Sequence, residues 1–386
     1  MQPLYSFPAL ADYHYFDYAA TTCMPEEVLQ AWLSFQHNVF VSTDRGTGAL
    51  SARAEEVKSE SIRTLHSFFS LGRRTNWMFS KNVTEAINLT AQGLEKNIEP
   101  MDYIAVGPFE HHSNFLPWRY LAKRTDAVFI ELPTDRFGRL DLDYLELIGD
   151  RIKVFSYSAV ANTNGYSLQE NEVFPYLRKD AIVCCDLSQQ QAHESINLND
   201  RVDIAFLTSH KMYGPKNIAA AVFDDEIASR LSPVLLGGGM VDSIGLDDFW
   251  ADGDRKYNAG TIDVGLIAAW SEATRFMERI SFESIAEFEQ ELFRKITGGL
   301  SGLKHYSIIS SPDHSSIISF VSQIHHPHDI KNYFDSRGIV IRSGNLCSQN
   351  SIRKYDQNAI NRISLGIGIR DSDVSALLTA LEDLDR

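Results

Sequence analysis

Short apolar segments alternate with amphipathic segments through the first two thirds of the chain. Helical patterns at residues 84–94, 115–123 and 171–177 lie between several of the apolar segments. This alternation is typical of an α/β domain built on a mainly parallel sheet. The seven predicted strands cover residues 76–79, 103–106, 127–131, 152–156, 181–186, 204–208 and 219–223.

The pattern changes near residue 270, where a long amphipathic helix is predicted over residues 268–298. Shorter elements follow it and indicate a small α+β domain. These are strands at 307–309, 316–321, 339–342 and 362–366, with helices at 328–336 and 372–384. We therefore predict a large domain at residues 16–268 and a small C-terminal domain at 269–386. We expect residues 1–15 to pack on the small domain.

Length and charge narrow the class of protein. A chain of 386 residues is long enough for one domain of roughly 250 residues and a smaller one. The formal net charge of -15 gives a surface that repels phosphate backbones, so we expect no nucleic-acid partner. The N-terminus lacks the basic and apolar regions of a signal peptide, and no apolar run approaches the roughly 20 residues that span a bilayer. We expect a cytoplasmic protein without membrane contact.

The cysteines indicate a reducing compartment and one candidate nucleophile. Four occur in the chain, and their spacing contains no metal-binding C-x-x-C motif. Cys184 and Cys185 are adjacent, and a disulfide between neighbours would be strained. Cys347 is either a nucleophile in a loop or a small buried hydrophobe, which is the usual place of a free cysteine. Its loop context favours the nucleophile.

Two predicted strands end in residues that could carry chemistry. Ligands of open α/β sheets bind outside the carboxyl ends of the strands. One strand ends at Asp186, and the next ends at Thr208 and is followed by Lys211. Chemistry with pyridoxal 5′-phosphate (PLP) needs a lysine to hold the cofactor and a buried carboxylate to keep its pyridine nitrogen protonated. On these residues alone, the alternative stays open that Asp186 caps a helix and Lys211 is a solvated loop residue.

A larger set of segments resembles the fold-type I PLP enzymes of the class V aminotransferase superfamily, within it the cysteine desulfurase and selenocysteine lyase branch. The short spacing around Cys347 is more similar to the SufS-like enzymes than to the IscS-like ones. The resemblance implies a large domain with a mainly parallel seven-stranded sheet and a small α+β C-terminal domain. The matching segments follow the family order and cover residues 16–22, 84–89, 110–114, 161–162, 186–189, 209–215, 237–240, 259–261, 342–347 and 362–364.

The resemblance implies a role for each matching residue. Lys211 would hold the cofactor, and His111 would stack on its ring and relay protons. Asp186 would pair with the pyridine nitrogen, and Gln189 would bond the ring hydroxyl. The phosphate would be bound by Thr84, Thr208 and His210, with Thr261 contributed by the partner subunit, and Val83 stands at a phosphate position where the SufS-like branch usually has a hydroxyl residue.

The resemblance also implies which residues bind and act on the substrate, and most of them lie in the predicted small domain. Cys347 would be the nucleophile, and Asn162 and Arg362 would hold the substrate carboxylate. Arginine suits a carboxylate because its planar group can bind it with two hydrogen bonds. Arg342, also on the substrate side, is a candidate cation for the Cys347 thiolate. Further departures from the family pattern, which spare the core cofactor residues, occur at residues 187–188, 216–219, 345–346 and 366–369.

The resemblance implies a homodimeric, PLP-dependent cysteine desulfurase. It would convert L-cysteine to L-alanine, carry the sulfur as a persulfide on Cys347 and deliver it to an acceptor protein. The alternatives are a related PLP enzyme without that persulfide (a C–S lyase, selenocysteine lyase or class V aminotransferase) and a non-catalytic scaffold.

Two further motifs have structural interpretations. The glycine run at 236–239 lacks dinucleotide-binding spacing, and we expect a tight loop near the cofactor. The histidines at 325, 326 and 328 fit no recognised metal spacing, so we predict no metal site.

Overall fold

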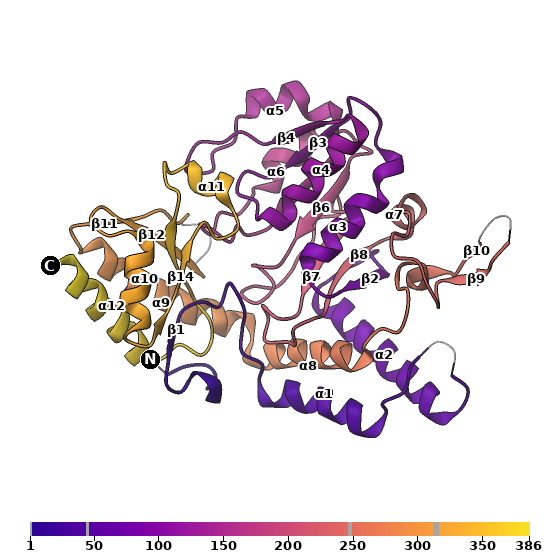
Figure 1. Cartoon of the computed structure of the whole chain (residues 1–386), viewed down its shortest axis with the longest axis horizontal. Helices are drawn as coiled ribbons and strands as arrows, with labels where there is room; N and C mark the ends of the chain where they lie inside the picture. Colours follow the sequence, from indigo (N-terminus) through magenta and orange to yellow (C-terminus); the bar gives the residue numbers. More distant parts are fainter. Residues whose placement is uncertain (1, 44–45, 246–248, 312–315) are drawn as a thin grey trace.

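A seven-stranded sheet forms the centre of the large domain. The computed structural model describes residues 2–43, 46–245, 249–311 and 316–386 (Figure 1). The sheet consists of β2 (Asn76–Ser80), β3 (Tyr103–Val106), β4 (Val128–Glu131), β5 (Ile152–Ser158), β6 (Ile182–Asp186), β7 (Ile204–Thr208) and β8 (Ala219–Phe223). Its strand order is β2-β8-β7-β6-β5-β3-β4. Pairing is parallel except that β8 runs antiparallel to both β2 and β7. The predicted α/β fold with a mainly parallel seven-stranded sheet is confirmed.

Successive residues of the central strands point to opposite faces of the sheet, and each face packs on its own hydrophobic cluster. In β6, Val183 and Cys185 belong to one cluster, whereas Ile182 and Cys184 belong to the other. All residues of β6 and β7 are buried, because helices cover both faces. This double burial is why these strands read as continuous apolar runs in the sequence.

The helices of the large domain flank this sheet. They are α1 (Glu26–Asn38), α2 (Ala49–Phe68), α3 (Val83–Gly93), α4 (Leu116–Thr125), α5 (Leu142–Ile148), α6 (Glu170–Val173), α7 (Asp225–Arg230) and α8 (Val264–Ile280). Trp118 of α4 packs in one cluster, and Trp270 of α8 packs in the other. The third predicted helix, at 171–177, is α6 followed by a short 3-10 helix at Phe174–Tyr176.

The single long helix expected at residues 268–298 is wrong. The stretch folds as α8 and a second helix, α9 (Phe282–Ser301), with Ser281 between them. Ser281 has φ of 70°, which ends α8, and its Oγ accepts a hydrogen bond of 3.2 Å from Ser284 N in the first turn of α9. The predicted boundary at 268/269 falls inside α8, which packs against α1 and α2. The division into two domains stays a prediction.

The C-terminal part of the chain forms a second, antiparallel sheet with helices beside it. The strands are β11 (Tyr306–Ile308), β12 (Ile317–Ser322), β14 (Arg342–Gly344) and β15 (Ile360–Ser364), in the order β11-β12-β15-β14. The accompanying helices are α9, α10 (Pro327–Asp335), α11 (Gln349–Arg353) and α12 (Asp371–Asp385). The short helix α11 has no counterpart in the sequence prediction, and it follows directly on the loop that carries Cys347.

The N-terminal segment lies along this second sheet. Its strand β1 (His14–Tyr15) pairs in parallel with β13 (Ile339–Val340), and Ser364 N donates to Phe16 O over 2.8 Å. The pairing brings residues 17–22 to the region between the two sheets. At the other end of the molecule, β9 (Val241–Ser243) and β10 (Phe249–Trp250) pair in an arm that projects outward (Figure 1). Within the described ranges, no helix has both the length and the apolar character of a membrane span.

Candidate functional site

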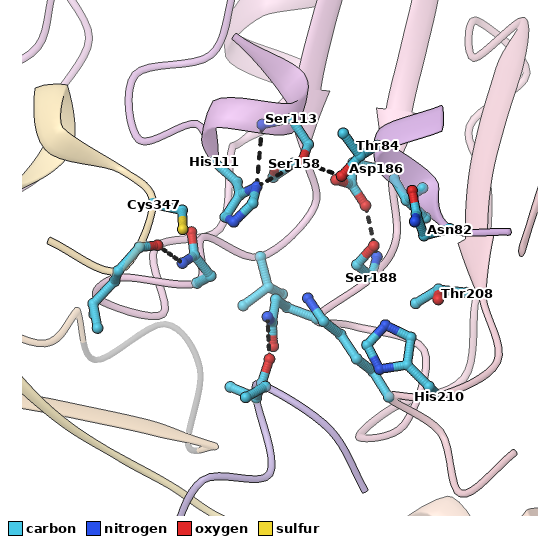
Figure 2. A pocket seen from close by; sticks show the side chains of 18 of the residues that line it. Asn82, Thr84, His111, Ser113, Ser158, Asp186, Ser188, Thr208, His210 and Cys347 are labelled. Atoms are coloured by element: carbon cyan, nitrogen blue, oxygen red, sulfur yellow. Dashed lines mark hydrogen bonds between the residues drawn. The ribbon is translucent and has the colours of Figure 1, made fainter. Parts of the chain in front are cut away.

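A cavity of about 300 Å³ lies at the carboxyl ends of β5, β6 and β7. Ser158 and Asp186, the last residues of β5 and β6, line it together with Thr208 at the end of β7. Four residues from the C-terminal part close the other side, namely Arg342, Leu346, Cys347 and Arg362. In Figure 2 Thr208 and His210 lie on the side of the cavity opposite Cys347.

The cavity brings together nearly all of the residues predicted for the site. Its lining includes Val83, Thr84, His111, Asn162, Asp186, Gln189, Thr208, His210, Lys211, Arg342, Cys347 and Arg362. Thr261 is exposed and lies outside this lining in its own chain. The roles given to these residues by resemblance stay predictions, but their convergence from seven separate segments is a property of the fold.

Lys211 is a half-buried residue whose amine lines the cavity with the buried carboxylate of Asp186. Burial lowers the pKa of Lys211 to about 8, although the charge of Asp186 opposes the shift. Burial likewise raises the pKa of Asp186, while a hydrogen bond of 2.9 Å from Ser188 N favours the ionised form. Lys211 therefore lines the cavity, and its role as the cofactor lysine stays a prediction. A lysine of this kind is available as a nucleophilic amine near neutral pH.

His111 presents a neutral ring to the same cavity. Burial and then the nearby charge of Lys211 lower the pKa of His111 to about 3. Its Nδ1 accepts a hydrogen bond of 3.1 Å from Ser113 N, so the neutral ring carries its proton on Nε2. Ser113 Oγ lies 2.6 Å from Thr84 Oγ1 (Figure 2). These contacts join the histidine to the first turn of α3.

The end of the cavity near α3 has the features of an anion site. Val83 and Thr84 form the first turn of α3, whose free N–H groups favour a negative charge. The hydroxyl of Thr208 is buried and has no hydrogen-bond partner among the described residues. Burial lowers the pKa of His210 to about 4, which leaves its ring neutral. Val83 can offer only its main chain here, because its side chain carries no hydroxyl.

The opposite end holds two arginines that share one carboxylate. Asp17 accepts from Arg362 Nη2 over 3.0 Å and from Arg342 Nη2 over 2.6 Å. Arg362 is buried and also donates from Nη1 to Asn162 O over 2.9 Å, while its Nε has no partner among the described residues. A guanidinium with an unsatisfied buried donor suits a carboxylate ligand. Sequence reasoning gave no role to Asp17, although the residue lies in the matching segment 16–22.

Cys347 is exposed, so the alternative of a small buried hydrophobe is wrong. It lies in the loop between β14 and α11 and lines the cavity. Arg342, the candidate cation for its thiolate, directs Nη2 to Asp17. The other three cysteines are also free thiols, and Cys184 and Cys185 are buried in β6.

Sequence reasoning also missed Glu110, a buried carboxyl behind the site. Its Oε1 accepts from Ser158 N over 2.8 Å, and its Oε2 accepts from Asn114 Nδ2 over 2.7 Å. Burial raises the pKa of Glu110 to about 7, and the charge of Asp186 adds to the increase. The only signal in the sequence was its place next to His111 in the segment 110–114.

The predicted place of the glycine run near the cofactor stays a prediction. The residues at 237–239 lie outside the lining of the cavity in their own chain; they adjoin the Thr261 segment, with Gly260 N donating to Gly238 O over 2.8 Å.

The histidine cluster at 325–328 has structural contacts. His325 Nε2 lies 2.9 Å from Leu384 O, and His326 caps α10. Among the described residues, no group of three or more His, Cys, Asp or Glu side chains is placed to hold a metal ion.

A cavity at the carboxyl edge of a mainly parallel sheet, lined by a lysine and a buried aspartate, defines the class of protein. The chain belongs to the aminotransferase class-V family, whose family model matches residues 14–377. The predicted superfamily is thus confirmed. The SufS-like assignment within it stays a prediction.

Two similar proteins are named as cysteine desulfurases. A probable cysteine desulfurase of Staphylococcus aureus is 28% identical over 375 residues, which cover 95% of this chain and 91% of the relative. A cysteine desulfurase of Escherichia coli is 27% identical over 379 residues, 96% of this chain and 93% of the relative.

Solved structures of the same class have the same fold. The apo structure of a cysteine desulfurase from Thermococcus onnurineus superposes with a TM-score of 0.92 at 27% identity, covering 98% of this chain and 96% of that one. The cysteine desulfurase CsdA of Escherichia coli, in an S-sulfonic acid form, gives a TM-score of 0.89 at 25% identity with the same coverage of both chains.

Proposed function

We propose that this protein is a PLP-dependent cysteine desulfurase, which converts L-cysteine to L-alanine and takes the sulfur onto Cys347 as a persulfide. One observation carries the proposal. A half-buried lysine, a buried aspartate and an exposed cysteine, which follow or end strands of two different sheets, line a single cavity. The named activity of the relatives at full length supports it.

The residues present fit the cofactor. The unpartnered hydroxyl of Thr208 and the N-terminus of α3 suit its phosphate, with Thr84 and His210 beside them. Lys211 would bind its aldehyde carbon, and Asp186 would keep the ring nitrogen protonated. His111 would stack on the ring, and Gln189 would donate to the ring hydroxyl. When bound, PLP supplies an electron sink for the carbanion formed at the substrate Cα.

The side chains then divide the remaining work. Arg362 and Asn162 hold the carboxylate of L-cysteine, and Arg342 stands beside them. Lys211 Nζ takes the proton from the substrate Cα, for which a pKa of about 8 is suitable. The Cys347 thiolate forms a bond to the substrate sulfur while the substrate C–S bond breaks. The electron pair of that bond stays with the substrate carbon, which gains protons to become alanine.

A homodimer completes the proposed site. Thr261 and the glycine loop at 237–239 both match the family pattern, yet both lie outside the cavity of their own chain. Their contact with each other makes one exposed surface that could reach the phosphate end of a second copy. We propose that Thr261 acts there, in the partner subunit.

The exposed thiol of Cys347 would allow transfer of the sulfur to an acceptor protein. Four free thiols favour a reducing cytoplasm as the compartment. Both the acceptor and the compartment belong to the proposal.

The deciding experiment is incubation with L-cysteine and a reductant, with alanine and sulfide measured. We expect equal amounts of both from wild type, and a persulfide on Cys347 by mass spectrometry. Cys347→Ala should keep the absorbance of bound cofactor but lose turnover, because only the sulfur acceptor is removed. Lys211→Ala should lose both. Pyruvate in place of alanine would identify a C–S lyase, and alanine formation by Cys347→Ala at the wild-type rate would refute the role of that thiol.

A further inference from the structure

The loop that carries Cys347 is bonded to the large domain through two residues. The first is His112, in the 3-10 helix His112–Asn114 that follows His111. Its main-chain N donates to Cys347 O over 2.7 Å, and its ring Nε2 accepts from Gln349 N over 3.1 Å. One histidine therefore holds the loop at the cysteine and again two residues after it.

The second residue is Asn162. Its Nδ2 donates to Leu346 O over 3.0 Å, and its Oδ1 accepts from Ser348 Oγ over 3.0 Å. Its own carbonyl accepts from Arg362 Nη1, so the proposed substrate-carboxylate site and the cysteine loop meet at this one asparagine. The residues at 346, 347, 348 and 349 thus each bond one of these two large-domain residues.

The backbone of the loop needs such support. Leu346 and Cys347 have φ of 50° and 53°, so two adjacent residues with Cβ atoms are in the left-handed region. Strained residues of this kind persist where the surrounding contacts over-determine them. On the inner side, the Leu346 side chain packs with Ile352 and Ile360 of the small sheet and its neighbouring helix. On the outer side, Asn345 Oδ1 accepts from Cys347 N over 3.1 Å.

We propose that His112 and Asn162 form a latch, the four hydrogen bonds named above, that fixes the position of the Cys347 thiol at the cavity. His112 is then a positioning residue for sulfur transfer, since its side chain contacts the loop backbone. The effect on sulfur transfer rests on the proposed desulfurase function, whereas the latch itself is a property of the loop. Residues 345 and 346 depart from the family pattern, and the latch takes only the main-chain carbonyl of Leu346 from these two positions.

A matched pair of variants isolates the ring contact. His112→Ala deletes the acceptor for Gln349 N but keeps the main-chain donor to Cys347 O. His112→Gln places an amide oxygen near the former Nε2, so it restores the acceptor without a titrating ring. Ser348→Ala removes the hydroxyl bonded to Asn162 and tests the other half of the latch.

The first measurement is hydrogen exchange at the Gln349 amide in the cofactor-loaded protein. Loss of one net hydrogen bond corresponds to about five- to tenfold faster exchange, which we expect for His112→Ala. We expect His112→Gln to stay within about twofold of wild type. The second measurement is single-turnover persulfide formation on Cys347, which should slow about tenfold or more in His112→Ala and recover in His112→Gln. The KM for L-cysteine and the absorption spectrum of the bound cofactor should change less than about twofold.

The outcomes separate the latch from the proposed function. Wild-type exchange and wild-type persulfide formation in His112→Ala would overturn the latch while leaving the desulfurase intact. Slow persulfide formation without faster exchange would also overturn it, because His112 would then act on the chemistry itself. If wild type forms no persulfide, the desulfurase fails and the role of the latch in sulfur transfer fails with it, whereas faster exchange in His112→Ala would still support the latch as a structural contact.

Discussion

Glu110→Gln tests the electrostatics behind the site, because the buried carboxyl contributes a pH-dependent term to stability. Its pKa rises from 4.5 in an open environment to about 7 in the folded protein. The folded state therefore binds the Glu110 proton more tightly, and the stability it contributes is full below pH 4.5 and is lost as the pH rises through 7. A shift of that size corresponds to about 3 kcal/mol. Because the group is almost completely buried, screening by water reduces this little.

The glutamine variant removes the titration but keeps the shape. It also introduces an NH₂ group opposite Asn114 Nδ2, a donor that now points at Oε2. Asn114 cannot reverse its amide without losing the bond from Trp118 Nε1 to its Oδ1. We expect this mismatch to cost about 1 to 3 kcal/mol at pH 5, where wild-type Glu110 is protonated.

The assay compares urea unfolding of wild type and Glu110→Gln at equal protein concentration, from pH 5 to pH 8. Titrations common to both proteins cancel in the difference. Wild type should be the more stable at pH 5, and its advantage should shrink or reverse by pH 8, with a total change of about 2.5 kcal/mol over this range. A difference that stays constant across this range would refute the raised pKa and the burial argument behind it.

Three further outcomes follow from the same cavity. Asp17→Ala should lower the free energy of unfolding by about 3 to 5 kcal/mol, because it leaves the buried Arg362 guanidinium without its carboxylate; urea unfolding measures this, and a loss below about 1 kcal/mol contradicts it. Thr208→Val should leave the stability of the cofactor-free protein unchanged, because the hydroxyl has no hydrogen-bond partner among the described residues. The same variant should weaken PLP binding about tenfold in a spectroscopic titration, and an affinity equal to that of wild type would exclude Thr208 from the phosphate site. The rate at which PLP condenses with the cofactor-free protein should rise with pH and level off above about 8, as Lys211 loses its proton, and a flat profile from pH 6 to 9 would contradict the lowered pKa.

The large sheet was predictable because its strands are simple in physical terms. β6 and β7 are buried on both faces, so each appears as an unbroken apolar run that stops where the cavity begins. The break at Ser281 was not predictable in this way. The apolar faces of α8 and α9 give one continuous periodic signal, and the residue that interrupts them is a serine in a left-handed conformation rather than a glycine.

The residues of the site differ in how far the sequence alone could predict them. Asp186 and Lys211 follow from the rule that ligands bind at strand ends, which uses only local pattern. Cys347 and Arg362 lie far along the chain, and only family resemblance associated them with the lysine. The contacts of His112 and Asn162 with the cysteine loop could not be predicted from sequence. Three of the four bond main-chain atoms of the loop, and a main-chain partner leaves no residue type to recognise.

The cavity must attract anions although the chain carries a net charge of -15. Three side chains that can carry a positive charge line it, those of Lys211, Arg342 and Arg362. They face two carboxylates, that of Asp186 in the lining and that of Asp17 bonded to both arginines, while His111 and His210 are held neutral. The anions it would bind are separated in space: a phosphate at the α3 end and a substrate carboxylate at the arginine end. Neutral histidines matter in this arrangement. A positive charge on His210 or His111 would push the nearby Lys211 amine further from its charged form. Burial therefore does two things at once, because the same desolvation that makes the Lys211 amine nucleophilic keeps its two histidine neighbours uncharged.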